Sequence, residues 1–110
     1  MNKKVTSTLL VPLFAALAFS LSAPAKASEE IVKKARCVAC HTVDAKRVGP
    51  AYKDVAAKYR GDAGAPARLF DKVRAGGSGN WGEIPMMAHP ADKISDDDLK
   101  AAIKWILSLH

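Results

Sequence analysis

The residues best suited to chemistry form one short segment, Cys37-Val38-Ala39-Cys40-His41. Two thiols one helical turn apart can each add to a vinyl group on one edge of a porphyrin. The histidine that follows directly can swing beneath the ring and give the iron a nitrogen ligand. The C-x-x-C-H spacing therefore predicts covalent attachment of one c-type haem.

Three other interpretations of the cysteine pair stay open at this point. A thioredoxin-like redox disulfide expects a βαβ context, which this sequence does not show. A structural disulfide would close so short a loop that it would stabilise the chain little. A zinc site would need an irregular set of ligands, namely Cys37, Cys40, His41 and His89.

A six-coordinate haem needs a second axial ligand, and the segment Ile84-Pro85-Met86-Met87 offers a thioether. This soft, uncharged donor favours ferrous iron and raises the reduction potential. Met86 is preferred because Pro85 stiffens the backbone directly before it, and Met87 and His89 are the alternatives. Two protein ligands leave no open iron position, which indicates one-electron transfer and not enzyme catalysis.

Helices must position these residues, because helix start and stop signals are frequent. The predicted helices run from Ser28, as N-cap, into Cys37; from Pro50 to Gly61; from Pro66 to Gly76; and from Ser95, as N-cap, with a buried stripe that includes Leu99, Ala102 and Ile103. No strand is predicted, because no clean run of alternating β-branched residues occurs. Gly76 to Lys93 is expected to be a long loop whose apolar residues lie against an apolar surface.

The first 27 residues form a separate unit in the sequence. Lys3 and Lys4 give a positive start, Leu9 to Leu21 is almost wholly apolar, and Ala25-Lys26-Ala27 is a small-x-small cleavage site. This is the three-part pattern of a secretory signal, with an uncleaved anchor as the alternative. The apolar run is shorter than the roughly 20 residues that span a bilayer. We expect a cleaved signal peptide over residues 1–27 and one domain over residues 28–110.

The charge balance argues against nucleic-acid binding. The 110-residue chain has a formal net charge of +6, and the 83 residues after the predicted cleavage site carry 14 basic and 11 acidic residues. A net charge of +3, only five aromatic residues and an exported location do not fit a nucleic-acid partner. A domain this small also buries too little apolar surface to be stable without further support, and a bound haem would add to its core.

The basic residues are concentrated in the first half of the predicted domain. Ser28 to Arg60 holds eight basic and four acidic residues, whereas Gly61 to His110 holds six basic and seven acidic residues. Lys46 and Arg47 follow the C-x-x-C-H motif closely, which suggests a positive field around the haem edge that steers acidic partners. Scattered, solvated lysines are the alternative.

Together these features resemble a short monohaem class I cytochrome c of bacterial denitrification and related respiration. Besides the C-x-x-C-H motif, the likeness rests on Val48-Gly49-Pro50-Ala51-Tyr52, Gly79-Asn80-Trp81-Gly82, Ile84-Pro85-Met86 and Lys104-Trp105-Ile106-Leu107. The resemblance implies an all-α, class I cytochrome c fold. Four to five helices would surround one covalently bound haem, with the first and last helices crossing and a long loop carrying the methionine.

The resemblance also implies a role for individual residues. Cys37 and Cys40 would be the haem thioethers, and His41 and Met86 the axial iron ligands. Three further residues belong to the implied haem environment. The carbonyl of Pro50 would accept the other ring N–H of His41, Trp81 would donate its indole N–H to a haem propionate, and Lys72 stands where an arginine often contacts a propionate.

The function implied is that of a periplasmic, monomeric one-electron carrier that is not an enzyme. Its partners would be redox proteins of the periplasm or inner membrane, such as nitrite reductase, terminal oxidase, cytochrome c peroxidase and quinol–cytochrome c reductase. The resemblance implies neither nucleic-acid binding nor stable membrane insertion after cleavage. A periplasmic thiol–disulfide protein and a haem sensor or peroxidase are the alternatives.

Overall fold

The computed structural model describes residues 9–12 and 25–110. In chain order its elements are α1 (Ala25–Lys34), the 3-10 turn η1 (Cys37–Ala39), α2 (Tyr52–Lys58), α3 (Ala65–Ala75), β1 (Gly77–Gly79), β2 (Gly82–Met86) and α4 (Asp96–Leu107). Among these described residues, the four predicted helices are all present. Within those residues, every helix is too short or too polar to cross a membrane.

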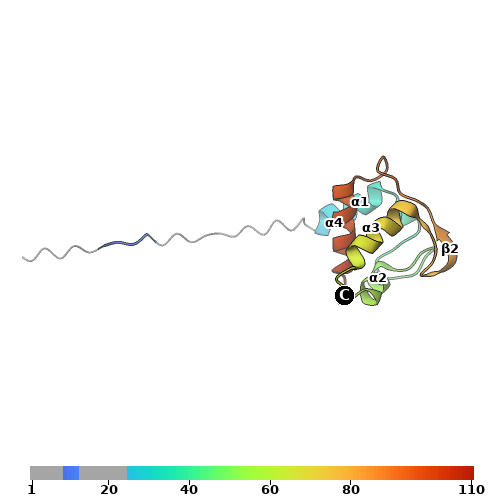
Figure 1. The fold of residues 1–110 in the computed structure, drawn as a ribbon, viewed down its shortest axis with the longest axis horizontal. Coiled ribbons are helices and arrows are strands. Elements are labelled where there is room, and N and C mark those ends of the chain that lie inside the picture. Colours follow the sequence, from blue (N-terminus) through green and yellow to red (C-terminus); the bar gives the residue numbers. More distant parts are fainter. Residues whose placement is uncertain (1–8, 13–24) are drawn as a thin grey trace, which may run out of the picture.

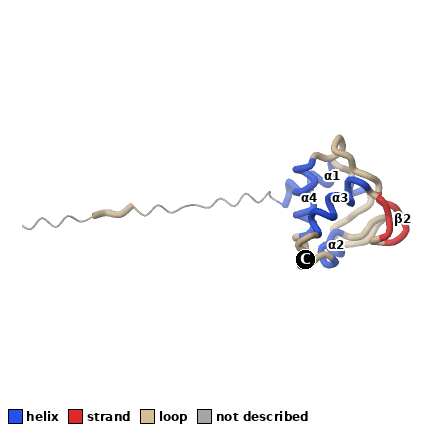
Figure 2. Tube along the Cα trace, viewed as in Figure 1, coloured by secondary structure: helices blue, strands red, loops and turns tan. Residues whose placement is uncertain are grey.

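Helix α4 is the centre of the packing, because it contacts α1, α2 and α3. Figures 1 and 2 show α1, α3 and α4 together on one side of the domain and β2 at the opposite edge. The core consists of two clusters, one with Val32, Tyr52, Ala102 and Trp105 and the other with Ala35, Ile94, Leu99 and Ile103. The contact between α1 and α4 confirms the predicted meeting of the first and last helices.

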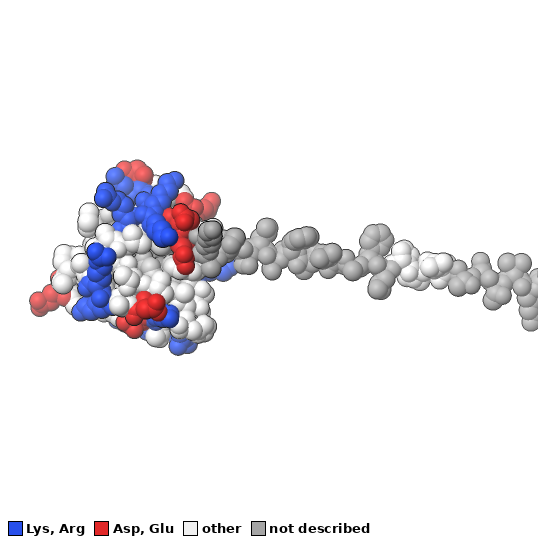
Figure 3. Space-filling view, turned by 180° about the vertical axis from the view of Figure 1, so that it is seen from behind, with Lys and Arg blue, Asp and Glu red and all other residues white. Residues whose placement is uncertain are grey.

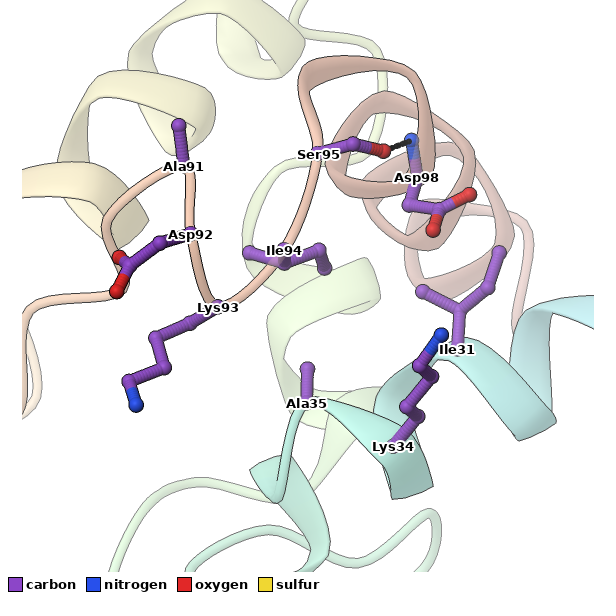
Figure 4. A pocket seen from close by; sticks show the side chains of 9 residues that line it. All are labelled: Ile31, Lys34, Ala35, Ala91, Asp92, Lys93, Ile94, Ser95 and Asp98. Atoms are coloured by element: carbon purple, nitrogen blue, oxygen red, sulfur yellow. Dashed lines mark hydrogen bonds between the residues drawn. The ribbon is translucent and has the colours of Figure 1, made fainter.

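The start of α4 follows the sequence signals. The Ser95 side chain accepts a hydrogen bond of 3.2 Å from the backbone N–H of Asp98 (Figure 4). Such a cap stabilises a helix by about 1 kcal/mol. Ile94, directly before the cap, is buried in the same cluster as Leu99, so the hydrophobic contact expected across the cap is present.

The predicted start of the first helix is wrong. Helix α1 begins at Ala25, so Ser28 lies inside it and is buried, at 3% exposed. Alanine and lysine are good helix formers, and the three residues before Ser28 extend the helix backward instead of ending it. Most of the predicted signal peptide lies outside the described residues. In the part that is described, Leu9, Leu10 and Val11 are exposed.

The second predicted helix is shorter than expected, whereas the third is confirmed. Helix α2 begins only at Tyr52, because the backbone N–H groups of Tyr52 and Lys53 donate to the carbonyls of Thr42 and Val43. The chain before α2 is thereby held extended. Helix α3 has Pro66 in its first turn, as predicted, where the missing N–H of proline costs nothing.

The expectation of no strand between Gly76 and Lys93 is also wrong. Strands β1 and β2 pair antiparallel, with Gly77 opposite Met86 and Gly79 opposite Gly82. The glycines at 77, 79 and 82 have φ angles of 107°, 116° and 111°. Glycine tolerates such angles and side-chain-bearing residues rarely do. The hairpin therefore depends on backbone freedom and not on the β-branched pattern that strand prediction requires.

Candidate functional site

The two cysteines lie in and directly after η1, at the end of α1. Arg36 turns the chain there with a φ of 63°, and the backbone N–H of Cys40 donates to the carbonyl of Cys37 at 3.1 Å. Both thiols are free and half-buried. Burial raises the pKa of the Cys37 thiol. Cys37 is therefore held as a neutral sulfur among apolar side chains.

The His41 ring is oriented by the segment that follows the motif. Its Nδ1 lies 2.7 Å from the carbonyl oxygen of Pro50. A carbonyl can only accept, so Nδ1 carries the proton and the Nε2 lone pair is left for another ligand. The structure thus contains the hydrogen bond that the family resemblance implies, and it presents the histidine as a nitrogen donor.

Gly49 allows the backbone to lie directly against this ring. A Cβ at position 49 would lie 2.5 Å from His41 Cε1 and 2.9 Å from Nδ1, far closer than two such atoms approach. The backbone N–H of Gly49 also donates to the carbonyl of Cys40 at 2.8 Å. Sequence reasoning missed this role, and its only signal was the glycine directly before Pro50.

Tyr52 stacks on the ring of His41. The two rings stack with centroids 5.3 Å apart and planes 17° apart, and Trp105 meets Tyr52 edge-on at 5.8 Å. The Tyr52 hydroxyl is buried without a hydrogen-bond partner. Burial, together with the neighbouring Cys37, raises the pKa of Tyr52. The sequence placed Tyr52 in the helical core stripe, which is correct, but did not reveal its contact with His41.

Met86 belongs to a second group of predicted residues, gathered around the hairpin. It is half-buried at the end of β2 and pairs with Gly77. Its carbonyl oxygen would lie 2.5 Å from a Cβ on Gly76. Met87, by contrast, is 78% exposed. The backbone around Met86 is therefore fixed against the end of α3.

Trp81 and Lys72 also lie at the hairpin. Trp81 is 42% exposed, and the ammonium of Lys58 sits 4.4 Å from the centre of its ring. The same ammonium donates to the carbonyl of Asn80 at 2.8 Å. Lys72 reaches over β1, where its Nζ would lie 3.3 Å from a Cβ on Gly77. Sequence reasoning missed Lys58, because it lies far from Trp81 along the chain.

The surroundings of these residues fit a large apolar group. Val38, Val48, Trp81 and Ile84 are all at least 40% exposed, and they lie on η1, on the loop after His41 and on the hairpin. In the part of the chain that the structure describes, no three histidine, cysteine or acidic residues form a metal cluster. The zinc set of Cys37, Cys40, His41 and His89 is therefore not supported. On the face shown in Figure 3, the largest group of basic side chains lies at the top, further basic side chains lie at the left and lower edges, and acidic side chains are interspersed among them.

Comparisons with known proteins cover this whole domain. The family model described as Cytochrome c matches residues 25–110. The chain is 51% identical over 92 residues to cytochrome c-551 of Allochromatium vinosum, which covers 84% of this chain and 96% of that protein. It is also 51% identical over 80 residues to cytochrome c-551 of Pseudomonas aeruginosa, covering 73% of this chain and 74% of the relative.

Solved structures agree with these relatives. The crystal structure of wild-type cytochrome c552 from Nitrosomonas europaea superposes with a TM-score of 0.68 at 48% identity, over 74% of this chain and 99% of that one. The class 1 cytochrome MtoD of Sideroxydans lithotrophicus superposes with a TM-score of 0.67 at 33% identity, over 77% of this chain and 95% of that one.

Proposed function

The chain belongs to the cytochrome c family, and from this premise we propose that it is a periplasmic one-electron carrier whose haem iron is ligated by His41 and Met86. It has the class I cytochrome c fold, as predicted, and members of the family carry one covalently attached c-type haem in chains of this size. The observation that carries the proposal is the His41–Pro50 hydrogen bond of 2.7 Å, because it fixes the ring tautomer that a metal ligand needs.

Cys37 and Cys40 would hold the haem through thioethers. Their place on one short turn, with both sulfurs free and half-buried, suits two bonds to one edge of a flat group. The raised pKa of Cys37 also counts against the alternative of a thiol–disulfide protein. Such chemistry needs a thiolate, and the burial of Cys37 disfavours that form.

When bound, the haem supplies a ferric–ferrous couple that gains and loses one electron. The chain's own residues determine how that couple behaves. The carbonyl of Pro50 and the ring of Tyr52 together fix the orientation of the His41 ring. Met86 offers a neutral thioether, which favours the reduced state. If His41 and Met86 both held the iron, the protein would leave no coordination position open to substrate or oxygen, and we therefore assign the chain electron transfer and no catalytic activity.

The remaining residues of the proposed site act on its periphery. Pro50 orients the histidine, and Trp81 and Lys72 offer an indole N–H and an ammonium to the haem propionates. Lys58 fixes Trp81 from α2 by lying over its ring at 4.4 Å. The exposed apolar side chains of the hairpin keep water from the group.

Export by a signal peptide over residues 1–27 is part of the proposal. The exposure of Leu9, Leu10 and Val11 agrees with a segment that does not join the core. Cleavage after Ala27 would remove the first three residues of α1 and leave Ser28 as the first residue of the domain. The electron partners would then be redox proteins of the periplasm or inner membrane, of the respiratory or denitrification chains.

Visible spectra and a mass measurement on periplasmic material test this function. We expect a reduced-minus-oxidised haem spectrum, colour that stays with the chain after acid extraction, and a mass equal to residues 28–110 plus one haem. We also expect the ferrous protein not to bind carbon monoxide readily. A colourless protein with two alkylatable thiols would support the thiol–disulfide alternative, and ready carbon monoxide binding would support a sensor or peroxidase.

Electrostatic steering gives a second expected result. Lys46 and Arg47 are exposed on the loop that leads to Pro50, beside the half-exposed Val48. A change of both to glutamate is expected to slow electron transfer to ferricyanide, an anionic oxidant, by about tenfold at low salt. Transfer by the parent protein should also slow as salt is added, which stopped-flow absorbance measures.

The control makes the same change of charge elsewhere, through Lys100→Glu with Lys104→Glu, which are both exposed on α4 and line a groove there with Pro66 and Phe70 of α3. It is expected to change the rate by less than about twofold. Equal effects of the two double variants, or rates that do not depend on salt, would show that the basic residues are merely scattered.

A further inference from the structure

The chain that leaves β2 is held against the C-terminal end of α3. The backbone N–H of His89 donates to the carbonyl of Val73 at 3.0 Å. A Cβ on Gly76 would lie within 3 Å of backbone atoms of Met86, Met87 and Ala88. The end of α3 is thus the surface on which the segment containing Met86 rests.

Arg74 is the side chain that fastens this segment. Its Nη1 donates to the carbonyl of His89 at 3.0 Å and to the carbonyl of Ile94 at 2.7 Å. Its Nη2 donates to the carboxylate of Asp96 at 2.6 Å, and its guanidinium carbon lies 5.1 Å from the centre of the Phe70 ring. The side chain is only 18% exposed. One guanidinium therefore joins α3, the segment after Met86 and the first turn of α4.

We propose that Arg74 is a positioning residue for the axial methionine, which keeps the segment from Met86 to Ile94 seated on α3. The inference rests on the proposed function, because it takes Met86 as the iron ligand. Release of the two carbonyls would free the backbone on the C-terminal side of Met86. The segment would then open locally more often, and the sixth coordination position would become accessible without unfolding of the domain.

The two carbonyl bonds matter more than the ion pair. Asp96 is 66% exposed, and ion pairs with an exposed partner contribute roughly 0–1 kcal/mol. The carbonyls of His89 and Ile94, in contrast, are bonded by a largely buried charged donor, and such bonds are the stronger class. A planar guanidinium also reaches several acceptors at once, which a lysine ammonium in its place does less well.

The probe is imidazole, added to the ferric, haem-loaded protein. An Arg74→Gln variant is expected to bind imidazole at least about tenfold faster than the parent. Hydrogen exchange of the His89 amide should accelerate by a similar factor, which reports opening of the segment independently of the haem. Asp96→Asn should change either rate by less than about threefold.

The matched control is Arg68→Gln, which makes the same substitution on the same helix. Arg68 pairs with Asp62, away from the segment, and both side chains are at least 40% exposed. It should leave imidazole binding and His89 exchange within about twofold of the parent. If Arg74→Gln does not fold, Arg74→Lys replaces it, and both rates are expected to rise above those of the parent and of Arg68→Gln.

The outcomes separate this inference from the proposed function. If Met86→Ala binds imidazole no faster than the parent, the assignment of the ligand is wrong. A second outcome would contradict only the role of Arg74. In that case Met86→Ala binds imidazole fast, so the assignment of Met86 as the iron ligand holds. The Arg74 variants, however, bind imidazole no faster than the parent does. Global unfolding in guanidinium, followed in parallel, shows whether a rate increase reflects loss of the whole fold, which would also contradict local positioning.

Discussion

A Met86→Ala variant of the haem-loaded protein is expected to bind carbon monoxide in the ferrous state roughly 10- to 1,000-fold more tightly than the parent. With the thioether in place, only the small fraction of molecules in which the segment has opened can accept an external ligand. Removal of the sulfur makes every molecule competent. The reduction potential should fall as well, because a ligand that favours ferrous iron is lost.

The neighbouring methionine provides the control for this prediction. Met87 has the same side chain one position away but is 78% exposed, whereas Met86 is half-buried and pairs with Gly77. Met87→Ala should leave both carbon monoxide affinity and potential close to those of the parent. If instead Met87→Ala showed the large changes in carbon monoxide affinity and potential, Met87 would be the axial ligand. A large change only in His89→Ala would make His89 the axial ligand.

Features that depend on short-range chemistry could be predicted from the sequence. The cap of α4 at Ser95 and the start of α3 at Pro66 depend on hydrogen bonds and dihedral angles within one helical turn. The C-x-x-C-H motif is equally local, because its three reactive residues share one turn. Ser28 is the exception, because a capping residue does not end a helix when the residues before it are good helix formers.

Features that depend on contacts between distant segments could not be predicted. Arg74 bonds carbonyls 15 and 20 positions away, and backbone carbonyls have no signature in a sequence. Lys58 meets Asn80 over a separation of 22. The hairpin could not be predicted for a related reason. Its glycines indicate that the backbone can adopt unusual dihedral angles, but they do not indicate which two segments pair.

Gly76 combines both kinds of constraint, and its replacement by alanine is expected to be among the most damaging single changes in the domain. Its φ of 69° and ψ of −158° fall in a region that is essentially restricted to glycine, which costs other residues about 1–3 kcal/mol. The new Cβ would also lie 2.5 Å from the carbonyl oxygen of Met86 and 2.7 Å from the backbone nitrogen of Ala88. Such overpacking costs roughly 1–3 kcal/mol more.

These contacts are with backbone atoms, so no side-chain rotation can relieve them, and the methionine segment itself must move. We therefore expect Gly76→Ala to lower the free energy of unfolding of the haem-loaded protein by about 2–6 kcal/mol, measured in guanidinium. We also expect the ferric protein to bind imidazole faster, by at least about tenfold, because the segment is no longer seated on α3.

Gly82→Ala separates backbone strain from displacement of the methionine. Gly82 also has a positive φ, of 111°, but nothing lies within 4 Å of a Cβ built on it. The Gly82→Ala variant should therefore lose only about 1–3 kcal/mol in its free energy of unfolding. It should also bind imidazole almost as slowly as the parent protein does. If both variants opened the iron to imidazole equally, general weakening of the hairpin would be the cause. A selective effect of Gly76→Ala would instead locate control of the axial methionine at the end of α3, where its backbone rests.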